Sequence, residues 1–269
     1  MFKTRTNKNI DVQNLPWAPE RITSTRRLPH VFAQDELPQA DKRGLAGARL
    51  FFSARTREAS RVEHTAPMSG RDTVVVTGFG PFRQFLVNPS WRAAQGLKLI
   101  GLGERIDVCI KELPVSYVQT QRVIAEIWQT LHPKFVVHLG IARGSSVVTL
   151  EQTGKNRGYR DKDVRGHCPV SHCCVDEAPE ELCSVIDMRA VSKQLKEEAG
   201  MDVVYSRDAG RYLCDFAYYC SLYHGQGRAA LIHIPTSGGL ASADRLVPLL
   251  QTLIRTMLPA DRPVGDMKR

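Results

Sequence analysis

The sequence lacks any apolar run long enough to cross a bilayer. A membrane-spanning helix needs about 20 consecutive, mostly apolar residues, and no stretch of the 269 residues approaches that length. The first thirty residues also lack the continuous apolar segment of a secretory signal peptide. The sequence therefore predicts neither an integral membrane protein nor a secreted one.

The number and spacing of the cysteines do not fit a framework of disulfide bonds. The seven cysteines are odd in number, run from Cys109 to Cys220 and include the adjacent pair Cys173 and Cys174. Small secreted domains carry even numbers of cysteines at recurring spacings. The reducing cytosol is the simplest compartment, so we expect a cytoplasmic protein. The Arg-rich start leaves a mitochondrial transit peptide open, although Asp11 and Glu20 make it a poor example.

Positive charge is unevenly spread. The chain carries a formal net charge of +9, which alone would suggest a nucleic acid or a membrane surface as partner. Residues 1–70 contain 12 lysines and arginines against 7 acidic residues, whereas residues 71–269 contain 25 against 21. The excess belongs mainly to the leading segment, so we expect neither nucleic acid nor membrane as a partner.

The leading segment also lacks hydrophobic periodicity. Residues 1–70 contain five prolines and scattered charges, which predict a flexible basic extension with a short helix near Gly44–Phe52 and Met68 as an alternative start. Regular patterns begin at Thr73. They predict one folded domain over residues 71–260, followed by a tail over residues 261–269.

From Thr73 onward, short β-branched runs alternate with amphipathic stretches. This order predicts an α/β protein: a three-layer α/β/α sandwich around an open, largely parallel, twisted sheet. The expected strands are Thr73–Thr77, Ile106–Glu112, Phe135–Leu139, Val203–Ser206 and Ala229–Ile234. The expected helices are Asn88–Leu99, Ile124–Leu131, Asp187–Ala199, Cys214–His224 and Leu246–Met257.

Ligands of such sheets bind beyond the carboxyl ends of the strands, so a binding site is expected in the loops that follow the strands. The first strand is followed by Gly78-Phe79-Gly80-Pro81-Phe82. A dinucleotide fingerprint needs a third glycine where this chain has Arg83. The remaining turn presents Phe79 and Phe82, either as core anchors or as walls of a binding site.

A second loop contains glycines and precedes a carboxylate. Residues 140–146 follow the third expected strand, and backbone N–H groups of such a loop can bind an anion or oxyanion. The apolar run Val147–Leu150 then ends at Glu151. Glu151 is expected near the same rim, although a lone glutamate is more often a surface residue.

A cysteine and a histidine could form a catalytic group with Glu151. Cys214 is expected at a helix N-terminus, where the helix dipole and a nearby imidazolium would stabilise a thiolate nucleophile. His233 ends the last expected strand and could act as general base, oriented by Glu151. The alternative is that Cys214 is a buried small hydrophobe.

The segment His167–Cys174 could suggest zinc. Structural zinc sites use two paired spacings, and this single cluster has only Cys183 nearby. We therefore expect no metal site and no cofactor.

Together these segments resemble the pyroglutamyl-peptidase I family of cysteine peptidases, which has an α/β/α fold, and most closely its vertebrate members. The segments that carry the resemblance are VVVTGFGPF, VNPSW, VTLEQTGKNRGY, CPVSHCCVDEAPE, DAGRYLCDFAYYCSLY and LIHIP. The extension over residues 1–70 is not part of the family pattern and points to a paralogue.

The resemblance implies hydrolytic removal of N-terminal pyroglutamate from small peptides. Glu151, Cys214 and His233 would form the catalytic triad. Phe79 and Phe82 would hold the flat lactam ring, with Asn88, Ile141, Tyr212 and Leu213 lining the same site. Bacterial members carry a glutamine where Ile141 aligns and an arginine near Ser145, so contacts there differ. A homo-oligomer is compatible with the resemblance, as is a paralogue that binds pyroglutamyl peptides without turnover.

Overall fold

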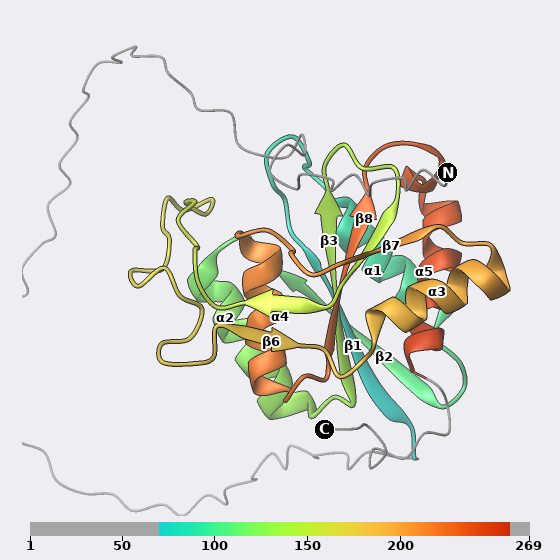
Figure 1. Ribbon diagram of the computed structural model, residues 1–269, viewed down its shortest axis with the longest axis horizontal. Coiled ribbons are helices and arrows are strands. Elements are labelled where there is room, and N and C mark those ends of the chain that lie inside the picture. The colour runs from blue at the N-terminus through green and yellow to red at the C-terminus, as the bar shows by residue number, and fades with distance from the viewer. Residues whose placement is uncertain (1–69, 259–269) are drawn as a thin grey trace, which may run out of the picture. The chain divides into compact units, whose positions relative to one another are not determined.

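Buried β-branched runs form the centre of the fold, as their patterns predict. The computed structural model describes residues 70–258. The expectations for the basic extension, the helix near Gly44–Phe52, the alternative start and the tail fall almost wholly outside the described residues. Figure 1 shows the sheet between two groups of helices, which confirms the expected three-layer α/β/α arrangement.

Within residues 70–258, six strands form one sheet in the order β2-β1-β3-β8-β4-β7. They are β1 (Asp72–Phe79), β2 (Ile106–Leu113), β3 (Phe135–Ala142), β4 (Val148–Glu151), β7 (Val203–Ser206) and β8 (Ala229–Pro235). The strands β5 (Thr153–Lys155) and β6 (Glu181–Cys183) pair antiparallel in a small second sheet. Five of the six strands of the large sheet correspond to expected strands.

Strand β4 was not expected, and its direction matters for the site. It lies between β8 and β7, antiparallel to β8 and parallel to β7, whereas β2, β1, β3 and β8 are mutually parallel. The sheet is therefore largely but not wholly parallel. The carboxyl end of β4 consequently points away from the rim at which β3 and β8 end.

The helices divide between the two faces of the sheet (Figure 1). They are α1 (Pro89–Ile100), α2 (Tyr117–Glu126) with the π-helical turn η2 (Ile127–Leu131), α3 (Met188–Ala199), α4 (Leu213–His224) and α5 (Ala243–Met257). Helices α2 and α4 pack together on one face, whereas α1, α3 and α5 pack on the other. The short helix η3 (Gly239–Ala241) leads into α5.

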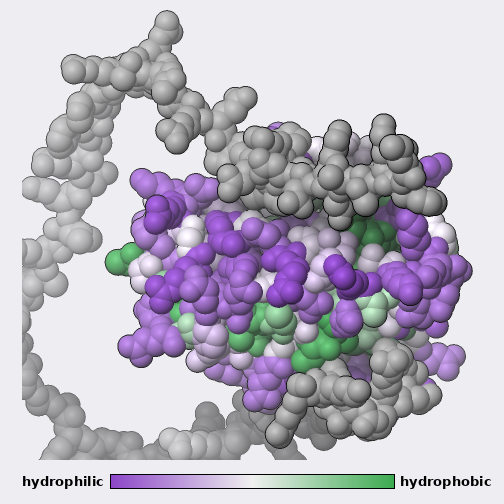
Figure 2. Space-filling view, viewed as in Figure 1, coloured by the Kyte–Doolittle hydropathy of each residue, from purple (hydrophilic) through white to green (hydrophobic). Residues whose placement is uncertain are grey.

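Alternation along the strands gives each face its own core. In β1, Val74 and Val76 face α1 and α5, whereas Val75 and Phe79 face α2 and α4. The face seen in Figure 2 is mostly hydrophilic, with hydrophobic residues in separate groups. Among the described residues, no helix is long and apolar enough to span a membrane.

Candidate active site

Cys214 lies in the first turn of α4, at the position that the sequence predicts. The chain turns at Gly210, whose φ of 83° suits glycine, and Tyr212 keeps an extended backbone as the N-cap. Helix α4 then begins at Leu213, so Cys214 is its second residue and is half-buried. The N–H groups of this first turn have no partners within the helix and favour a negative charge.

His233 reaches Cys214 across a strand residue that has no side chain. Gly140 of β3 pairs with His233 of β8, so both lie on the face covered by α4. A Cβ atom at Gly140 would lie 2.8 Å from Cys214 Sγ and 3.1 Å from His233 Nε2. The sulfur and the ring nitrogen therefore meet directly above Gly140, and only glycine leaves them that space.

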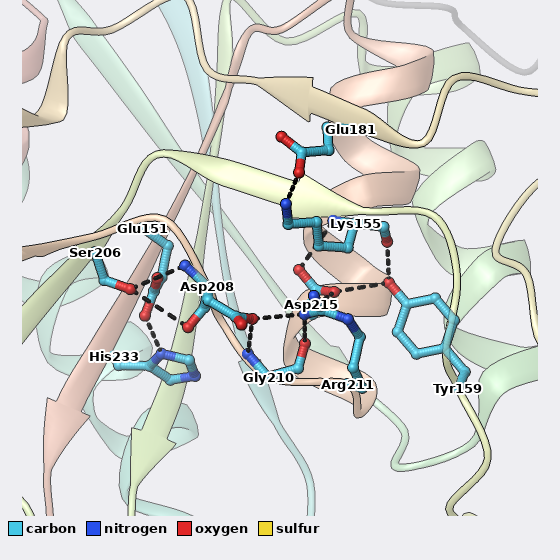
Figure 3. A network of polar contacts seen from close by, with 10 residues as sticks. All are labelled: Glu151, Lys155, Tyr159, Glu181, Ser206, Asp208, Gly210, Arg211, Asp215 and His233. Carbon is cyan, nitrogen blue, oxygen red and sulfur yellow. Dashed lines mark hydrogen bonds and ion pairs between the residues drawn. The ribbon is translucent and has the colours of Figure 1, made fainter. Parts of the chain in front are cut away.

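Glu151 completes the group from the other side of His233. The His233 Nδ1 lies 2.9 Å from Glu151 Oε1, and this carboxylate is 3% exposed. Glu151 pairs with Leu231, two residues before His233 in β8. It therefore lies one pleat in from the rim, and it reaches His233 diagonally because β4 runs antiparallel (Figure 3).

This arrangement favours a charged histidine. Burial of the ring acts against its charge, but hydrogen bonds and charges from Cys214 and Glu151 outweigh burial and raise the pKa of His233 to about 10. An imidazolium next to a thiol stabilises the thiolate form of that thiol. The geometry thus supports a nucleophile, an acid/base and an orienting carboxylate.

An aromatic wall lies beside Cys214. Phe82 and Tyr212 have ring centroids 5.7 Å apart, and Tyr117 packs edge-on against Tyr212 with centroids 5.9 Å apart. Phe79 is buried in the same core, whereas Phe82 and Tyr212 are half-buried. These side chains offer apolar surfaces on the face of the sheet that carries the triad.

Asn88 holds this wall in place through backbone contacts. Its Oδ1 accepts hydrogen bonds from the Ser90 N–H and hydroxyl and so caps α1, as the sequence predicts. Its Nδ2 donates to the Gly80 carbonyl at 3.0 Å, inside the turn between Phe79 and Phe82. Leu213 is buried in the core below, next to Cys214.

The structure does not bring the Ile141 side chain to this face. Because neighbouring strand residues point to opposite faces, Ile141 packs with the core under α1, α3 and α5, whereas Gly140 faces Cys214. In the loop that follows, two backbone N–H groups already have hydrogen-bond partners. The Gly144 N–H donates to Thr236 Oγ1 and the Ser145 N–H donates to the Ala142 carbonyl, so neither is free for an oxyanion.

Sequence reasoning missed several residues that support the triad. The sequence predicts Gly140 in a loop, but it is a residue of β3 whose missing side chain makes room for the thiol. Tyr218, one turn after Cys214, donates to the backbone carbonyl of Glu151 at 2.9 Å. Asp215 is fully buried and binds Lys155, Tyr159 and Arg211 (Figure 3). The sequence did offer one indication for Asp215, because an acidic residue on the buried face of a predicted helix is unusual.

The other cysteines and histidines do not assemble a metal site in the part of the chain that the structure describes. Between residues 70 and 258, no group of three or more His, Cys, Asp or Glu side chains is placed to hold a metal ion. Cys174 instead contacts Cys220, with the two sulfurs 2.8 Å apart, in the core beside α4.

The chain is similar to known proteins of one family. The family model described as pyroglutamyl peptidase matches residues 72–247. Pyroglutamyl-peptidase 1 of Rattus norvegicus is 47% identical over 200 residues, which cover 73% of this chain and 95% of that protein.

The chain belongs to the pyroglutamyl peptidase family.

Other members show the range of the family. Pyroglutamyl-peptidase 1-like protein of Homo sapiens is 43% identical over 164 residues, or 60% of this chain and 83% of the relative. A solved pyrrolidone carboxyl peptidase variant from Pyrococcus furiosus superposes with a TM-score of 0.62 at 26% identity, covering 69% of this chain and 98% of its own. The family match spans all three residues of the triad and the aromatic wall.

Proposed function

We propose that this protein is a cysteine peptidase that removes pyroglutamate from the N-terminus of small peptides. The observation that carries the proposal is His233, bound by Glu151 on one side and by Cys214 on the other, above the gap at Gly140. Relatives named pyroglutamyl-peptidase and pyrrolidone-carboxylate peptidase support the substrate class.

The first half-reaction forms a thioester. The Cys214 thiolate attacks the carbonyl carbon that joins pyroglutamate to the next residue, and the charge moves onto the carbonyl oxygen. The Cys214 backbone N–H, at the N-terminus of α4, is the best-placed donor for that oxyanion, because Gly144 and Ser145 use their N–H groups elsewhere. The His233 imidazolium then donates its Nε2 proton to the leaving amine as the C–N bond breaks.

The second half-reaction restores the enzyme. Neutral His233 takes a proton from water as the water oxygen attacks the thioester carbonyl, and the C–S bond breaks to release pyroglutamate and the Cys214 thiolate. Glu151 keeps the ring in the orientation that both steps need and stabilises the imidazolium.

The aromatic wall suits a neutral lactam. We assign Phe79, Phe82 and Tyr212 to the walls around the pyroglutamyl ring, with Leu213 beneath them and Asn88 fixing the turn that carries the two phenylalanines. A free N-terminal amine is charged and would lose its hydration against such walls without a partner. The enzyme should therefore distinguish pyroglutamyl peptides from the same peptides with a free glutamine.

The deciding experiment compares turnover of a fluorogenic pyroglutamyl amide by the wild type and two cysteine variants. Cys214→Ala is expected to lower kcat by about 10⁴-fold or more, because the nucleophile is lost. Cys183→Ala removes an exposed free thiol and should leave kcat close to the wild-type value. A folded wild type that binds the amide without hydrolysing it would instead indicate a non-catalytic paralogue.

We also propose that the enzyme works in the cytoplasm. All seven cysteines are unpaired in the structure, which suits a reducing compartment.

A further inference from the structure

The residue after the nucleophile has an environment that the reaction itself does not explain. Asp215 is completely buried in the first turn of α4. A carboxylate is rarely buried unless it is paired and hydrogen-bonded, because its desolvation is costly. Figure 3 shows it between the segment that follows Glu151 and the loop that precedes Cys214.

Three donors from two segments converge on this carboxylate. The Lys155 backbone N–H donates to Oδ1 at 3.2 Å, and the Tyr159 hydroxyl donates to Oδ2 at 3.0 Å. The Arg211 guanidinium lies 3.6 Å from Oδ2. Lys155 ends β5 and Tyr159 follows it, so Asp215 joins the helix of the nucleophile to the segment that continues from Glu151.

Arg211 extends the contact into the loop that leads to Cys214. Its Nη1 lies 2.6 Å from Asp208 Oδ1 and donates to the Gly210 carbonyl, while the Gly210 N–H donates to Asp208 Oδ1 at 3.1 Å. Its side-chain carbons pack against Gly158, where a Cβ atom would lie 3.3 Å from Arg211 Cδ. The direction of the N–H groups at the start of α4 therefore depends on these contacts.

We infer that Asp215 is a positioning residue for the reaction: its carboxylate holds the first turn of α4 in register with Glu151 and His233, and Arg211 transmits that contact to the loop before Cys214. The inference rests on the proposed function, because it concerns the alignment of the Cys214 N–H with the oxyanion. Asp215 itself touches neither the thiol nor the substrate carbonyl in this role.

The ionised form of Asp215 is the one that matches its surroundings. Two of the partners, the Lys155 backbone N–H and the Arg211 guanidinium, can only donate, so they match an ionised carboxyl better than a protonated one. Burial raises the pKa of Asp215 to about 7, against Arg211 and the hydrogen bonds from Tyr159 and Lys155, which lower it. The other ionisable groups that face this site are Asp208, Tyr218 and Cys174; the Lys155 ammonium is paired with Glu181.

The test is the pH dependence of kcat and KM for the pyroglutamyl amide, from about pH 5.5 to about pH 9. As the pH falls through about 7, Asp215 gains a proton, so wild-type kcat is expected to fall with a midpoint there. In Asp215→Asn this acid limb should be absent, the plateau of kcat should drop about tenfold or more, and KM should change less than about twofold.

Two further variants keep the test decisive. Arg211→Gln changes a side chain that is 33% exposed, so it is compatible with folding even if Asp215→Asn is not. Because Arg211 lowers the pKa of Asp215, its removal should move the acid limb to higher pH. Asp244→Asn is the matched control, because Asp244 is also an acidic first-turn residue, in α5, but is exposed.

Each outcome has one meaning. An acid limb that persists in Asp215→Asn, or one that stays in place in Arg211→Gln, overturns the inference and leaves the proposed function intact. A wild type that does not hydrolyse the amide overturns the proposed function and the inference with it. Loss of the limb in Asp215→Asn with an upward shift in Arg211→Gln supports both.

Discussion

At the scale of single residues, proton affinity sets the working range of the site. The pKa of His233 is raised to about 10, so the ring keeps its proton through neutral pH and loses it only as the pH rises through that value. A charged imidazolium beside Cys214 favours the thiolate form of that thiol.

Alkylation of Cys214 measures this directly. At about pH 6 we expect iodoacetamide to alkylate Cys214 at least about tenfold faster in the wild type than in His233→Asn, because the imidazolium favours the thiolate. Peptide mass spectrometry identifies the modified cysteine. Equal alkylation rates in the wild type and in His233→Asn would contradict the ion pair.

Gly140 is the residue at which the smallest change should matter most. In Gly140→Ala the new methyl group would lie 2.8 Å from Cys214 Sγ and 2.9 Å from His233 Cδ2, so the thiol and the ring must separate. Displacements of about 1 Å can cost about 100-fold in rate, and we expect at least that loss in kcat. Steady-state kinetics with a thermal melt would check it; a folded variant with unchanged kcat would refute the spacing argument.

At the scale of elements, two helix caps form a natural comparison. Asn88 caps α1 and also holds the Gly80 carbonyl, whereas Asp187 caps α3 by accepting from the Ala190 N–H far along the chain from the aromatic wall. Asn88→Ala and Asp187→Ala should each lower the free energy of unfolding by about 1 kcal/mol. Only Asn88→Ala should raise KM for the pyroglutamyl amide, because it also frees the turn that carries Phe79 and Phe82. Urea unfolding and kinetics separate the two effects, and an equal KM in both variants would contradict this role of Asn88.

Helices and strands that have a clear local sequence pattern could be predicted, whereas those that depend on distant segments could not. Strand β7 has the predicted bounds Val203–Ser206, and Asn88 caps α1 as its sequence pattern indicates. Strand β4 escaped because it has only four residues, the shortest run over which an alternating pattern can be recognised. Its antiparallel insertion between β8 and β7 depends on segments far along the chain, which no local pattern reports.

The same distinction applies to the site. Cys214, His233 and Glu151 could be named because thiol, imidazole and carboxylate are chemically distinctive at strand and helix ends. Gly140 and Asp215 could not, because their importance lies in an absent Cβ atom and in three donors that meet only in the folded chain. Ile141 was misplaced in the same way, since its face of the sheet follows from the exact register of β3.

At the scale of the whole molecule, most of the net positive charge and the residues proposed for catalysis lie in different parts of the chain. Residues 1–70 account for five of the nine net positive charges, whereas the family match covers residues 72–247. A chain that starts at Met68 is therefore expected to keep kcat/KM close to the full-length value. It should elute from a cation exchanger at lower salt, because fewer positive charges bind the matrix. Loss of activity in a folded shortened chain would contradict this division.

The position of β4 also determines when activity can arise during folding. Glu151 and His233 lie 82 residues apart in sequence, and β4 is bordered in the sheet by two strands that are synthesised after it. Contacts of such large separation form slowly, because the chain between them must first be ordered. The reactivity proposed for Cys214 should therefore be among the last properties that a newly made chain acquires, and its appearance would time the final step of folding.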